Sequence, residues 1–139
     1  MRNRVLLTGT LLLICAGAAI GEDDGSGLVG RWTGDSICVG DRPACKNESV
    51  VYRIAKPPDR SGNVRIEADK IVGGSVVNMG AIDFKYDREA KTLTGQIPIG
   101  VWRFTVADKA MEGTLTLMPE NTVMRRVKLA KESPARRSS

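Results

Sequence analysis

The sequence predicts an all-β fold, an antiparallel up-and-down barrel of about eight strands formed by one domain. Apolar and polar residues alternate over short segments from Leu28 onward, and turn residues separate these segments. No stretch after the N-terminal segment shows the apolar stripe of a helix. Closing such a meander into a barrel removes its edge strands. A two-sheet sandwich stays open as an alternative, because alternation alone does not distinguish the two.

The N-terminal segment, residues 1–21, is predicted to be a cleaved secretory signal. Arg2 and Arg4 precede an apolar run that is too short to anchor in a bilayer, and small residues follow it. We therefore expect an exported protein, periplasmic or extracellular. Cys15 raises the alternative of a lipoprotein, but the bulky Ile14 stands where such sites usually hold a small residue, so lipidation is not expected.

The remaining chain is predicted to form one barrel domain over residues 22–131 and a disordered basic tail over residues 132–139. The expected strands carry alternating patterns and lie at 30–38, 49–56, 63–68, 69–72, 75–78, 81–87, 101–107, 111–117 and 122–130. Gly73 and Gly74 are typical of a two-residue hairpin turn. Eight or nine strands with short connections result.

Two cysteines remain after the signal, Cys38 and Cys45, and an exported protein can keep them as a disulfide. Such a bridge closes the loop between the first two strands. The alternative is a redox or metal site. The spacing is not C-x-x-C, however, and the chain has no histidine to complete a zinc site.

The first expected strand opens with Gly30-Arg31-Trp32. This resembles the G-x-W motif that opens the first strand of lipocalins and related calycin-type barrels. The resemblance implies that Trp32 lies under the closed end of the barrel, with an arginine of the last strand packed over it. Arg125 shares the inward phase of Val127 in that strand, so Trp32 and Arg125 are predicted to form a barrel-closing pair.

A second likeness extends over W-x-G-x-S-x-C at residues 32–38, followed by Cys45, Glu48 and Tyr52. This pattern is similar to that of a set of small exported bacterial proteins of uncharacterised function. The likeness supports export but implies no activity.

An enzymatic function is not expected. Without histidine, the chain lacks the usual general base, the usual zinc ligand and any Ser-His-Asp arrangement. Glu48 has the inward phase and is the best candidate for a buried acid, but at a strand start it is expected to accept backbone or arginine hydrogen bonds. No catalytic residue, metal or cofactor is predicted.

Binding is the expected role. Large side chains that share the inward phase are candidates to line a cavity: Tyr52, Phe84, Tyr86, Trp102, Phe104 and Met111. A barrel of about eight strands either fills itself with such side chains or holds one small ligand, and both outcomes stay open. We expect a monomer that binds a small apolar or amphipathic ligand, with no nucleic acid partner. The alternative is a protein-interaction module, because the chain is similar in size to small bacterial barrels that inhibit proteases.

Overall fold

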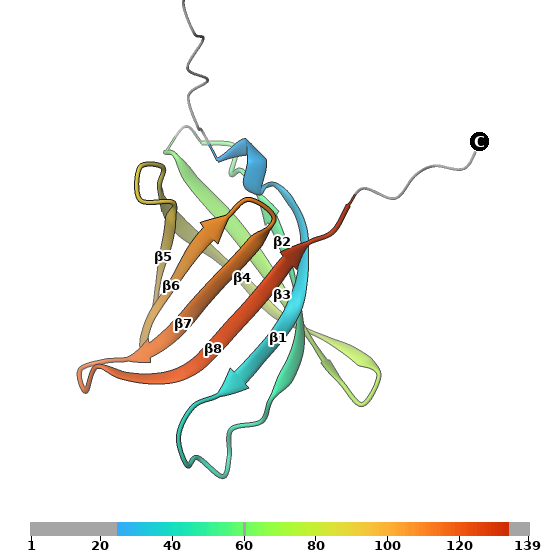
Figure 1. Cartoon of the computed structure of the whole chain (residues 1–139), viewed down its shortest axis with the longest axis vertical. Helices are drawn as coiled ribbons and strands as arrows, with labels where there is room; N and C mark the ends of the chain where they lie inside the picture. Colours follow the sequence, from blue (N-terminus) through green and yellow to red (C-terminus); the bar gives the residue numbers. More distant parts are fainter. Residues whose placement is uncertain (1–24, 60, 134–139) are drawn as a thin grey trace, which may run out of the picture.

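A computed structural model describes residues 25–59 and 61–133 (Figure 1). The predicted signal, with Cys15, and residues 134–139 of the predicted tail lie outside the described residues. One turn of 3-10 helix, η1 (Ser26–Leu28), precedes the strands. The strands are β1 (Gly30–Cys38), β2 (Glu48–Ala55), β3 (Asn63–Val72), β4 (Ser75–Asp87), β5 (Thr92–Ile97), β6 (Gly100–Ala107), β7 (Ala110–Leu117) and β8 (Thr122–Lys131).

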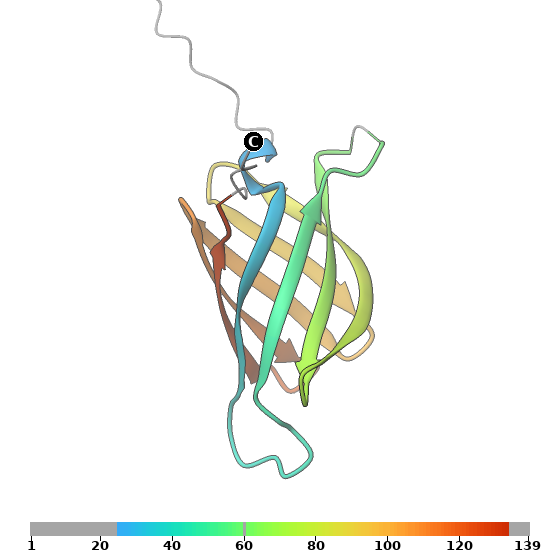
Figure 2. The ribbon, with the colours of Figure 1, turned by 90° about the vertical axis from the view of Figure 1, so that its right-hand side faces the viewer.

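The strands form a closed antiparallel barrel in which each strand pairs with the next along the chain and β8 pairs with β1 (Figures 1 and 2). The closing register runs from Trp32 opposite Lys131 to Cys38 opposite Arg125. The predicted fold class is confirmed. Because β8 pairs with β1, the sheet closes into a barrel and does not form a two-sheet sandwich.

The alternating pattern defines the interior of the barrel. The buried cluster takes its members from the inward phase of the strands and from η1: Leu28, Trp32, Val50, Tyr52, Ile54, Val64, Ile66, Phe84, Leu93, Phe104, Met111, Val127 and Leu129. Removing this much apolar surface from water is the main favourable contribution to folding.

Two glycines allow the close approaches that the curved wall requires. A Cβ on Gly34 would lie 1.8 Å from the backbone carbonyl oxygen of Lys128 in β8, and a Cβ on Gly113 would lie 2.2 Å from the ring of Phe104. No side chain fits at either position, as expected for glycines at tight points of a barrel.

One end of the barrel is closed by η1 and Trp32. The indole has no exposed surface, and its N–H donates a hydrogen bond of 2.8 Å to the Leu28 carbonyl oxygen. Leu28 is itself buried in the core. Trp32 therefore lies against η1, whereas the lipocalin resemblance implied an arginine of the last strand as the group that covers it.

Strand β4 is longer than the sequence predicted. The segments expected at 75–78 and 81–87 form one strand, because a bulge opposite Ala68 absorbs the extra residue between them. Gly80, with φ +92°, sits at this bulge, and its N–H donates to the Asn78 side chain. Gly73 and Gly74 form the predicted hairpin turn, both with positive φ.

A polar cluster on the outer surface fixes the bulge. The Arg53 guanidinium of β2 pairs with Asp69 and Glu67 of β3. The Asn78 amide of β4 donates to the same two carboxylates, at 2.9 Å to Asp69 and 3.0 Å to Glu67. The hydrogen bonds from Arg53 and Asn78 hold the pKa of Asp69 below its usual value, although burial opposes them.

Candidate functional site

The candidate site is an apolar cavity of about 280 Å³ on the inner side of the barrel wall. It lies toward the end opposite η1. Its lining comes from β2, β3, β4, β5 and β6, and consists of Tyr52, Ile66, Ala68, Met79, Gly80, Ile82, Phe84, Ile97 and Trp102. A concave site lined mainly by hydrophobic and aromatic side chains is typical of small-molecule binding.

The cavity lies behind an incomplete seam in the barrel wall. Strand β4 pairs with β5 only through Lys85, Tyr86 and Asp87, although β4 begins at Ser75. The lining residues Met79 and Ile97 come from the parts of β4 and β5 that do not pair with each other. The cavity therefore borders the one seam where the described strands leave a long stretch of edge unpaired.

Phe104 is the centre of the aromatic packing behind the cavity. Its ring stacks on Trp102 with centroids 5.8 Å apart, and it meets Tyr52 and Phe84 edge-on at 5.9 Å each. Offset stacked and edge-on arrangements are the favourable geometries for aromatic pairs. Three of the cavity-lining rings, Tyr52, Phe84 and Trp102, therefore pack on the core residue Phe104.

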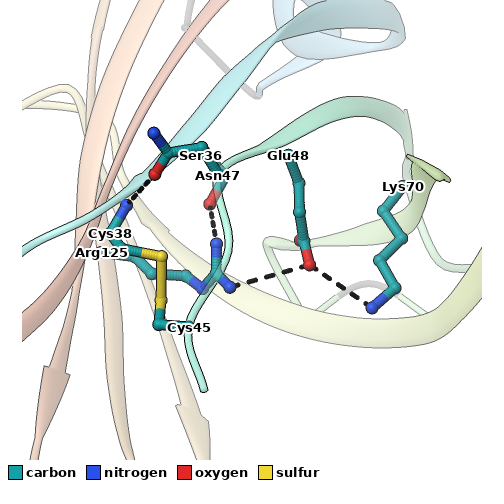
Figure 3. The surroundings of a disulfide bond; sticks show 7 residues. All are labelled: Ser36, Cys38, Cys45, Asn47, Glu48, Lys70 and Arg125. Atoms are coloured by element: carbon teal, nitrogen blue, oxygen red, sulfur yellow. Dashed lines mark hydrogen bonds and ion pairs between the residues drawn. A yellow bond between two sulfur atoms is a disulfide. The ribbon is translucent and has the colours of Figure 1, made fainter. Parts of the chain in front are cut away.

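Four polar side chains lie inside the barrel at the end that carries the disulfide (Figure 3). Arg125 of β8 donates a hydrogen bond of 3.1 Å to the Ser36 hydroxyl, and its guanidinium lies 3.7 Å from the Glu48 carboxylate. The Lys70 ammonium approaches the same Glu48 oxygen at 3.4 Å. These four residues, the inner polar group, place two cations near one partly buried carboxylate.

Tyr52 connects the inner polar group to the cavity. Tyr52 and Glu48 both lie on the inner face of β2, with Val50 between them, and Tyr52 also lines the cavity. Burial raises the pKa of its phenol well above the usual value, against a smaller opposing effect from the charge of Arg125. The phenol therefore stays a neutral hydrogen-bond donor at physiological pH.

The predicted cavity-lining residues divide into three groups. Tyr52, Phe84 and Trp102 line the cavity. Phe104 and Met111 are each 1% exposed and pack in the core. Tyr86 packs against the core near η1 and lines a shallow surface pocket there instead. The barrel is thus packed near η1, and the cavity lies on the side formed by β2 to β6.

The predicted pair of Trp32 and Arg125 does not form. Arg125 points inward as expected, but its register partner on β1 is Cys38, and Trp32 stands opposite Lys131. The phase of an alternating strand says which face a residue occupies and nothing about its height in the barrel. Arg125 therefore meets Ser36 and Glu48 at the opposite end of β1 from Trp32.

The predicted disulfide between Cys38 and Cys45 is confirmed. It closes the loop between β1 and β2, and the backbone N–H of Cys38 also donates to the Asn47 side chain at 2.9 Å (Figure 3). The loop residues 40–44 are exposed. The bridge fixes the positions from which Ser36 and Glu48 extend into the barrel.

Sequence reasoning missed several residues of the site. Lys70 and Ser36 were not singled out, although each shares the inward phase of its strand with buried residues. Met79 and Gly80 line the cavity at the bulge, where the sequence indicated only a break between two strands. Glu48 was identified as a candidate buried acid expected to accept backbone or arginine hydrogen bonds; in the structure it forms an ion pair with Arg125 at 3.7 Å and accepts a hydrogen bond from Lys70.

Within residues 25–59 and 61–133, no three side chains of the metal-binding types gather into a group that could hold a metal ion. In the same part of the chain, no helix combines the length and the apolar character that a membrane crossing requires.

No protein-family model matches this chain, and no curated protein matches its sequence.

Proposed function

We propose that this protein is an exported, non-enzymatic barrel that binds one small amphipathic molecule in the cavity between β4 and β6. The observation that carries the proposal is the cavity itself, apolar on nearly all sides and bordered by the unpaired stretch of β4. Eight-stranded barrels have an interior wide enough for one small ligand.

The lining indicates the chemistry of the ligand. Ile66, Ile82 and Phe84 provide an apolar surface for a hydrocarbon or aromatic body. Tyr52 provides a neutral donor, and Arg125 lies close enough to affect the phenol. A ligand with an apolar body and a hydrogen-bond acceptor at one end matches both properties.

The volume limits the size of the ligand. A cavity of about 280 Å³ is slightly smaller than the roughly 300–1,000 Å³ that is typical of ligand sites. The proposal therefore concerns a single small molecule and excludes a bulky lipid with several chains.

Export is also part of the proposal. Arg2, Arg4 and the apolar run after them have the layout of a signal, and the likeness to small exported bacterial proteins points the same way. The disulfide of Cys38 and Cys45 is compatible with an oxidising compartment.

A filled-cavity variant provides the test. Ala68 lines the cavity, so Ala68→Phe fills it, whereas Ala55→Phe makes the same change on the outer face at the end of β2. The probe is 1-anilinonaphthalene-8-sulfonate, an aromatic body with one anionic end, titrated into the disulfide-bonded protein and followed by fluorescence. Circular dichroism and thermal melting establish that both variants are folded.

The wild type and Ala55→Phe are expected to bind one probe molecule with similar Kd, and Ala68→Phe to bind at least about tenfold more weakly. Equal binding by the two variants, or no binding by the wild type, would overturn the proposal. Native mass spectrometry of protein isolated gently from its host adds a second check: extra mass that is lost on denaturation supports a carried ligand.

A further inference from the structure

The β3–β4 hairpin reaches beyond the barrel wall and exposes apolar side chains at its tip. In Figure 1 it projects to the lower right, away from the other strands. Every residue from 71 to 81 is exposed. The exposed fractions reach 66% for Val76, 51% for Val72 and 46% for Met79. Apolar side chains gathered on a projecting arm are unusual on a protein that acts alone.

The arm also has an open edge. Residues 75–78 and 81–84 of β4 pair with β3 on one side, and none of residues 75–84 has a strand partner on the β5 side among the described residues. Unpaired edges attract other strands, and proteins usually protect them with charged residues or proline. Positions 75–81 read SVVNMGA, with no charge and no proline.

The hairpin geometry identifies the backbone groups on that edge. Gly73 and Gly74 make a two-residue turn, so the pairing of Val72 with Ser75 next to it is hydrogen-bonded, and pairs alternate from there. The backbone N–H and C=O groups of Val76 and Asn78 consequently face the open side.

From this edge we propose that two copies of the chain associate through β4, antiparallel, about a two-fold axis at Val77. Val76 of each copy then pairs with Asn78 of the other, and both pairs exchange backbone hydrogen bonds. Val77 meets its own copy at the axis. An isologous contact of this kind closes on itself, so it produces a dimer.

Charge and shape favour a second copy of the chain as the partner that pairs with the open edge of β4. The edge carries no charge, so self-pairing brings no like charges together. The arm is held at a fixed angle by Arg53, Asp69 and Asn78 at its base, which lowers the entropy that association must overcome. Because the arm projects from the barrel, the two barrels stay apart when the arms pair.

The test uses Val77→Glu, with Val72→Glu as a matched control. Val77 stands opposite Lys70 in the hairpin, so a glutamate there has a favourable neighbour in the monomer. In the dimer it faces a second glutamate at the axis. Val72 lies on β3 at the tip of the hairpin, outside the proposed contact. Val72→Glu therefore introduces the same negative charge away from the contact. Circular dichroism and thermal melting establish that both variants are folded.

Sedimentation velocity over a concentration series is expected to show a monomer–dimer equilibrium for the wild type. Val77→Glu should raise the dimer Kd by more than about tenfold, and Val72→Glu should leave it within about twofold. Under mild oxidation Val77→Cys should form a disulfide-linked dimer, and Val72→Cys should not. A wild type that stays monomeric, that forms only larger aggregates, or that responds equally to both glutamates overturns the proposal.

Discussion

Trp32 and Arg125 should contribute to stability independently, because they lie far apart in the barrel. Trp32 is near the start of β1, and Arg125 of β8 pairs with Cys38, the last residue of β1. Trp32 has no exposed surface and donates to the Leu28 carbonyl, so Trp32→Ala should cost about 3–5 kcal/mol. That is a large share of the roughly 5–15 kcal/mol by which domains are stable. Arg125→Met loses the bonds to Ser36 and Glu48 and should cost about 1–3 kcal/mol.

The expected coupling between the two sites follows from their separation. Arg125 is opposite Cys38, which follows Trp32 by six residues on β1, a distance of roughly 20 Å. Substitutions more than about 10 Å apart that share no partner add to within about 0.5 kcal/mol. The double variant should therefore lose the sum of the two single losses.

The assay is urea unfolding of the wild type, both single variants and the double variant, with the native disulfide intact. Arg125→Met combined with Glu48→Gln serves as the positive control, because these two side chains are in contact and should couple. If Trp32→Ala does not fold, Trp32→Phe completes the same cycle. A coupling above about 1 kcal/mol between positions 32 and 125 would refute the register of β1 against β8.

Three further outcomes are expected. Replacing Cys38 and Cys45 together by serine should lower the free energy of unfolding by about 2.5 kcal/mol in urea titrations, because the short loop regains its freedom when unfolded. Gly34→Ala should lower Tm by more than about 5 °C in thermal scans, since the added methyl collides with the backbone of β8. Asp69 has a lowered pKa next to Arg53, so its stabilising contribution is present above about pH 4 and is lost as the pH falls through the lowered value. Asp69→Asn should therefore make stability less dependent on pH in that acidic range, and an unchanged acid titration would contradict this.

Much of the fold was accessible from local patterns. Alternation identified the inward faces correctly, as in Ile82, Phe84 and Tyr86 of β4 and in Val127 of β8. The turn at Gly73 was equally clear, because two consecutive glycines permit the positive φ that such a hairpin needs. Periodicity and turn chemistry act over a few residues, so one sequence is enough to reveal them.

The site was harder to predict because it depends on contacts between distant segments. Arg125 was assigned to the correct face and the wrong partner, since its height in the barrel is set by the pairing of β8 with β1. The cavity depends on two long-range features of β4: the bulge before Ala81, where its register with β3 shifts, and the end of its pairing with β5 at Lys85. The sequence marks a break at Gly80, but it does not show that β4 continues through that break as one strand.

The pairing of β1 with β8 also bears on the order of folding. Every other pairing joins neighbouring strands, so each can form as a local hairpin with little loss of chain entropy. The last one joins the first and the last strand of the barrel, and pairings of such high contact order are slow to form. The ring therefore closes after its hairpins exist. Until it does, β1 and β8 are free edges, the kind of surface that attracts strands of other chains.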